Sequence, residues 1–160
     1  MKTWIAGAGT ILAAYLVFAL LGPLAAPTAV VVDVFTIAVL LFGTIRGEIP
    51  GAVMGAVCGL IVDAFSLGVF GLAGLVLTSA GYLAGYVSRK INIHRWYRMF
   101  FFFFVLAALT FAAWAGLTVA VARSPLPWAG GLVLLRPIVT AVASALIYEA
   151  YRRLKARHDR

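Results

Sequence analysis

A succession of long apolar stretches, separated by short polar breaks, constrains this chain more than any other feature. A helix that crosses a bilayer needs about 20 mostly apolar residues, so 160 residues accommodate about six such stretches and their loops. Only 11% of the residues are charged, whereas about a quarter are charged in soluble domains. The pattern predicts one integral membrane domain over residues 1–160, an all-α bundle of six membrane spans.

The predicted spans end at polar or helix-breaking residues. They cover residues 3–22, 28–45, 49–65, 70–87, 99–122 and 131–151. Pro23 closes the first span, the trio Arg46-Gly47-Glu48 separates the second from the third, and residues 66–69 form a tight turn. The first apolar stretch exceeds the roughly 7–15 residues of a signal-peptide core, so we expect it in the mature protein.

The lysine and arginine residues predict the orientation, because short cytoplasmic loops carry an excess of them. Eleven of the thirteen fall on one side of the predicted bundle: Lys2, Arg46, Arg89, Lys90, Arg95, Arg98, Arg152, Arg153, Lys155, Arg157 and Arg160. Only Arg123 and Arg136 fall on the other. Both termini are therefore expected in the cytoplasm, as an even number of spans requires.

The net charge of +8 does not indicate nucleic acid, because the cations lie at the ends of apolar runs and no stacking platform lies between them. Membrane lipids are the expected partner of the basic tail, since cations beside the cytoplasmic leaflet are attracted to anionic headgroups.

Small residues recur every fourth position in the third span, at Gly47, Gly51, Gly55 and Gly59, and Asp63 follows at the same interval. Such spacing lets two helices approach closely in lipid. The fourth span repeats the pattern more weakly at Gly74, Gly81 and Gly85. These glycines either pack the helices of this chain or form a groove for a partner helix; the residues proposed for these roles are Gly51, Gly55, Gly59, Gly81 and Gly85.

Acidic residues within spans are costly, so each predicts a function or a partner. Asp33 is expected about five residues into the second span, and Asp63 about two residues from the end of the third. Arg123 and Arg136 should lie at the same outer side. An arginine can satisfy a carboxylate with two hydrogen bonds, so we expect Arg136 to pair with Asp33 or with Asp63. Whether this cluster is a structural lock or binds a partner or ligand stays open.

On the inner side, Glu149 should pair with Arg46 or with a cation of the tail.

The residues that could carry catalysis are few. His94 and His158 lie far apart, Cys58 lies inside an apolar run, and no serine belongs to a nucleophile motif. No metal-ligand spacing is present either. The sequence therefore predicts a protein that is not an enzyme and binds no cofactor or metal.

A family resemblance extends over residues 33–86. It rests on Asp33, Arg46-Gly47, the ladder Gly51, Gly55 and Gly59 that runs into Leu60 and Asp63, then Gly71-Leu72, Thr78 and Gly81-Tyr82-Leu83-Ala84-Gly85. In this order the residues resemble the rod shape-determining protein MreD family. Val32 departs from the pattern, because many members are expected to carry proline there.

The resemblance implies a non-enzymatic, multi-pass protein of the bacterial inner membrane that supports lateral peptidoglycan synthesis. The partners it implies are the single-span protein MreC, the glycosyltransferase RodA with its transpeptidase, and the actin-like MreB. The family also resembles the substrate-binding S components of energy-coupling-factor vitamin transporters. A small-molecule transport subunit is therefore the alternative, and it would need a polar pocket near the outer face.

Overall fold

In the computed structural model, the residues that are described cover 33–65, 70–91, 96–122 and 135–158. Within these ranges the chain is all-helical and contains no strand. The helices are α3 (Val34–Arg46), α4 (Glu48–Phe65), α5 (Leu72–Lys90), α6 (Trp96–Ala122) and α7 (Arg136–His158). The first predicted span and the predicted turn at residues 66–69 lie outside the described residues.

Two glycines set the ends of neighbouring helices. Gly47 follows α3 with φ +102° and donates its N–H to the carbonyl oxygen of Gly43 over 2.8 Å. Gly71 precedes α5 with φ +95°. Glycine adopts positive φ without a steric penalty, which lets the chain end a helix and turn sharply. The predicted boundary at Arg46-Gly47-Glu48 is thereby confirmed.

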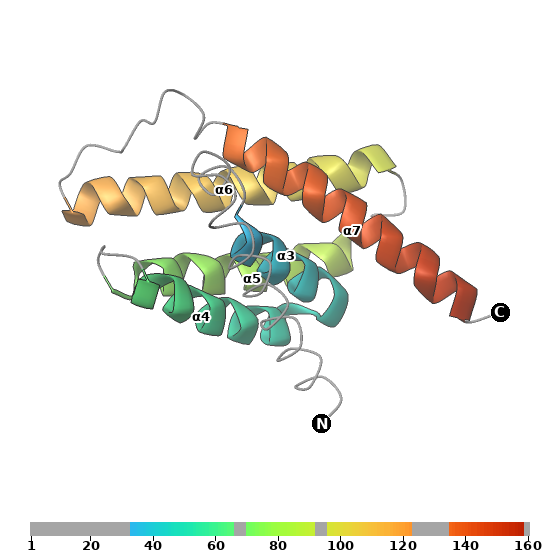
Figure 1. The fold of residues 1–160 in the computed structure, drawn as a ribbon, viewed down its shortest axis with the longest axis horizontal. Coiled ribbons are helices and arrows are strands. Elements are labelled where there is room, and N and C mark those ends of the chain that lie inside the picture. The colour runs from blue at the N-terminus through green and yellow to red at the C-terminus, as the bar shows by residue number, and fades with distance from the viewer. Residues whose placement is uncertain (1–32, 66–69, 92–95, 123–134, 159–160) are drawn as a thin grey trace.

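The described helices form two groups in contact. Helices α4 and α5 lie side by side and α3 packs against both, whereas α6 pairs with α7, which crosses α3 and α6 obliquely (Figure 1). An apolar cluster between the groups includes Leu40, Ala84, Phe103 and Ala145. A second cluster holds α3, α4 and α5 together, and its members include Val39, Met54, Cys58 and Leu77.

Among the described helices, two are long and apolar enough to cross a membrane: Glu48–Phe65, and Tyr97–Val121 within α6. Helix α3 is apolar but shorter. Large apolar side chains are exposed on every described helix from α4 to α7, among them Ile49, Leu75, Phe101 and Leu146. Large exposed apolar patches are unusual on a soluble monomer and mark membrane or protein contacts.

Two expected positions were wrong. Asp33 was expected five residues inside a span, but it is the N-cap of α3, because its side chain accepts from the N–H of Thr36 and thereby begins the helix. Arg136 was also expected five residues inside a span, yet it opens α7. Proline at the second position of α7 is compatible with this start, since the first turn needs no N–H from it.

At its other end α7 continues past Tyr151 to His158, so the basic tail begins as helix.

Candidate functional site

The glycines of α4 form a face that α5 covers. Gly51, Gly55 and Gly59 are all buried. A Cβ atom added at Gly55 would lie 2.8 Å from the Cα atom of Thr78, and one at Gly59 would lie 2.7 Å from the carbonyl oxygen of Ala73. Both distances are too short for carbon contacts, so only glycine permits this approach. The predicted packing role is confirmed.

Helix α5 contributes its own glycines to the same interface. An added Cβ at Gly81 would meet the carbonyl carbon of Gly51 at 2.6 Å, and one at Gly85 would meet Glu48. The five predicted glycines thus belong to one contact between two helices of this chain. Because α5 fills the groove, a partner helix has no room on the glycine face of α4.

Asp63 links the end of α4 to the start of α5. Its side chain is buried, with 5% of the residue exposed. Its Oδ2 atom accepts from the backbone N–H groups of Gly71 (3.0 Å) and Gly74 (2.9 Å), and Oδ1 accepts from that of Ala73 (3.0 Å). The first N–H groups of a helix lack partners within it, and a negative charge there is also favoured by the helix dipole. Asp63 therefore caps α5 from the neighbouring helix.

Asp33 has two roles at once. It accepts from the N–H of Thr36 at 3.1 Å and from its hydroxyl at 2.6 Å, and Oδ2 also accepts from Nη2 of Arg136 at 3.0 Å. The pair is half-buried, since 29% of the arginine side chain and 23% of the aspartate side chain are exposed. This ion pair joins the starts of α3 and α7.

Arg136 has further surroundings that the sequence did not indicate. Its guanidinium carbon lies 5.9 Å from the centre of the Trp114 ring on α6, within the range of a cation–π interaction. Its Nε atom is buried and has no hydrogen-bond partner among the residues that the structure describes. The Arg136 side chain, at the start of α7, thus contacts both α3 and α6.

The prediction that Arg136 pairs with Asp33 or with Asp63 is confirmed by the pair with Asp33, and Asp63 accepts from backbone N–H groups at the start of α5. Arg123, the fourth residue of the predicted outer cluster, lies outside the described residues. No group of three metal-binding side chains gathers within the described ranges.

At the other end of the molecule, Glu149 pairs with Arg152 and Arg153, each at 3.0 Å. The predicted pairing with a tail cation is confirmed. A second pair, Arg89 with Glu48 at 3.4 Å, was missed. The signal was present, because both residues flank spans on the same predicted side.

Comparison with known proteins finds no matching family model, no matching curated protein and no matching solved structure. The functional assignment therefore depends on the residues and their contacts. These contacts use glycine for close approach between helices and charge for joining helix ends.

Proposed function

We propose that this chain is a scaffold subunit of the bacterial cell-elongation complex, similar to MreD, and that it has no catalytic activity. In this role it binds an MreC-like single-span protein and supports lateral peptidoglycan synthesis together with RodA, its transpeptidase partner and MreB. The chain acts through helix surfaces within the inner membrane.

The observation that carries this proposal is the unit formed by α3, α4 and α5. The residues of the resemblance are contacting residues in it: Gly51, Gly55 and Gly59 meet α5, and Asp63 caps the helix that contains Gly81 and Gly85. Each match between these residues and the MreD pattern is weak alone, and the resemblance gains support because the matching residues of α4 and α5 contact one another. Substituting any one of them would disturb the others.

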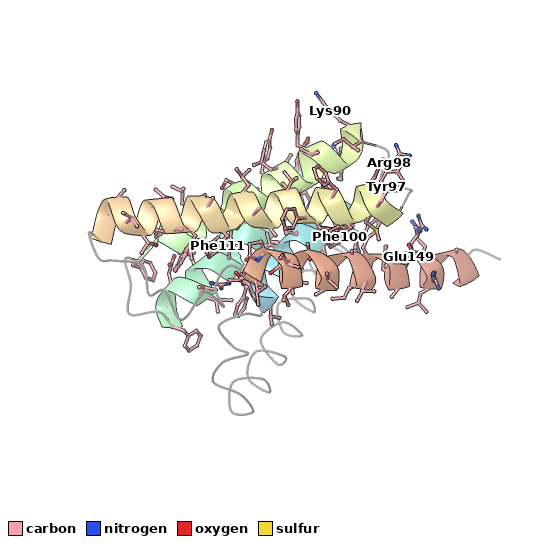
Figure 2. The ribbon with its side chains drawn as sticks, turned by 90° about the horizontal axis from the view of Figure 1, so that it is seen from above. Lys90, Tyr97, Arg98, Phe100, Phe111 and Glu149 are labelled. Atoms are coloured by element: carbon pink, nitrogen blue, oxygen red, sulfur yellow. The ribbon has the colours of Figure 1, made fainter. Side chains whose placement is uncertain are left out.

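Six spans with both termini in the cytoplasm are part of the proposal. The exposed apolar side chains of α4 to α7 support a lipid environment. Lys90, Tyr97, Arg98 and Glu149 lie toward one end of the molecule (Figure 2), and Arg89 pairs with Glu48 beside the turn between α3 and α4. The cations at that end, Arg89, Lys90 and Arg98, support it as the cytoplasmic one.

The deciding experiment purifies the tagged chain from its own membranes in mild detergent and identifies the bound proteins by mass spectrometry, while a parallel strain is depleted of the chain. We expect a single-span protein and a RodA-like glycosyltransferase to co-purify, and depleted cells to lose their rod shape. Rod-shaped depleted cells and a bound transporter ATPase would instead support the alternative.

The alternative is an S component of a vitamin transporter. The buried Nε of Arg136, which has no partner within the described part of the chain, favours it, because such a donor can bind an anionic small molecule. Thermal unfolding of the purified chain with and without carboxylate-bearing vitamins tests this function. A ligand-dependent rise in Tm that Arg136→Gln abolishes would favour transport over the scaffold.

A further inference from the structure

The last turns of α7 extend beyond the ends of the other described helices (Figure 1). Three apolar side chains near this end, Ile147, Tyr151 and Leu154, are 49%, 42% and 66% exposed. Their spacing of four and three residues places them on one side of the helix. The end of α7 therefore has an apolar stripe that no described helix covers.

The same segment is strongly basic. Residues 149–160 contain five lysine and arginine residues but only two acidic residues. Glu149 pairs with both Arg152 and Arg153, so one carboxylate serves two cations. The side chain of Arg153 is still 77% exposed, and Lys155 is exposed as well. This excess of positive charge beside the apolar stripe indicates an anionic partner.

The rest of the chain cannot supply that partner. Outside residues 149–160 it contains only three acidic residues, Asp33, Glu48 and Asp63. Each of them is engaged at another helix end, with Arg136, with Arg89 and with the backbone of α5 respectively. A second copy has the same net charge of +8 and would be repelled. The negative charge must therefore come from a different molecule.

The position of Leu154 favours lipid over an acidic protein as that molecule. Leu154 follows Tyr151 by about 4.5 Å along the helix, and the headgroup layer adds about 5–7 Å to each side of the hydrocarbon core. Because α7 crosses α3 and α6 obliquely (Figure 1), one side of its end stays close to the membrane surface. Basic helices with an apolar side are typical of segments that lie at this surface. An acidic protein would account for the cations but not for the exposed leucine.

We propose that residues 151–158 bind phospholipids with anionic headgroups at the cytoplasmic surface. Leu154 enters the headgroup layer, and Arg153 and Lys155 contact the phosphates. The structure thus adds an apolar anchor to the electrostatic attraction that the basic tail alone predicts. This inference rests on the cytoplasmic orientation that is part of the proposed function.

The first test attaches an environment-sensitive fluorophore to Leu154→Cys, in a chain whose native thiol is removed by Cys58→Ala. Ala156→Cys is the matched control, because Ala156 is exposed on the opposite side of the helix. The full chain is reconstituted in vesicles of equal parts phosphatidylcholine and phosphatidylglycerol, with a nitroxide lipid as quencher. We expect quenching at position 154 but not at 156, and its loss in phosphatidylcholine alone. Equal quenching at both positions, or in both kinds of vesicle, would overturn the proposal.

The second test removes one cation. Lys155→Gln should shift the label at position 154 about fivefold from the lipid-bound toward the free form, the effect of one cation at an anionic surface. Arg98→Gln on α6, which removes another exposed cation, should leave this equilibrium unchanged. Equal shifts with both variants would show that the net charge of the chain, and not contact at the end of α7, controls binding.

A third test distinguishes lipid from an acidic protein. The photo-crosslinking residue p-benzoylphenylalanine at position 154 in living cells should form adducts with lipid and none with protein. A protein adduct would overturn the proposal. None of these failures affects the scaffold function, which co-purification decides, whereas a chain that binds no single-span protein but shows quenching at position 154 would contradict the scaffold function alone.

Discussion

At the scale of single residues, the contact between α4 and α5 depends on the absence of side chains. We predict that Gly55→Ala destabilises the protein by about 1–3 kcal/mol, because the added methyl group would press on the backbone of α5. In thermal unfolding of the detergent-solubilised chain, Tm should fall by roughly 5 °C.

Gly116 on α6 provides the matched control, because an added Cβ there has no neighbour within 4 Å. Gly116→Ala should leave Tm unchanged or raise it, since alanine favours helix more than glycine does. Similar losses at both positions would show that helix propensity or handling, and not close approach, controls stability.

Asp63 gives a second prediction at this scale. Asp63→Ala removes the acceptor of three backbone N–H groups at the start of α5, at a cost of about 1–2 kcal/mol. Hydrogen exchange followed by mass spectrometry should show faster exchange, by about tenfold, in peptides that contain residues 71–74. Exchange in peptides from α7 is the internal reference. An unchanged rate at residues 71–74 would mean that the cap adds nothing to the stability of α5.

The sequence predicted the glycine face but not its neighbour. A spacing of four identifies residues on one side of a helix, and it says nothing about which helix covers that side. The role of Asp63 was missed for a related reason, because its acceptors serve N–H groups of the next helix, beyond the turn. Acidic residues near span ends are therefore candidates for capping the following helix as well as for ion pairs.

At the scale of helices, the pair formed by Asp33 and Arg136 joins the starts of α3 and α7. A double-mutant cycle with Asp33→Asn and Arg136→Gln separates this role from capping, because asparagine still caps a helix. We expect a coupling free energy of about 1 kcal/mol from thermal or denaturant unfolding, since the pair is half-exposed. Additive single effects would mean that the pair adds no stability and that Asp33 serves as a cap alone.

The sequence located the ends of most described helices to within a few residues, because charged residues and glycines interrupt the apolar runs. It failed at Asp33 and Arg136, where hydropathy alone continued the span through the charge. An aspartate three residues before Thr36 was available as a capping signal. Capping patterns should therefore take precedence over hydropathy when a charge falls near the end of an apolar run.

At the scale of the whole molecule, the outer surface is apolar over much of α4 to α7. We expect the chain to stay in the membrane pellet after washing with alkaline carbonate, because extraction would expose this surface to water. A peripheral protein of the same cell is the control and should be released. Recovery of the chain in the supernatant would contradict an integral membrane location.

The close contact between α4 and α5 has a mechanical consequence. Few side chains separate the two backbones at Gly51, Gly55 and Gly59, so little deformable material lies between them, and Asp63 fastens their joined ends. A force applied to α5 from outside would displace α4 by nearly the same amount. The pair should therefore move as one rigid unit, so that a displacement of α5 would reach the turn at Gly47 nearly undiminished.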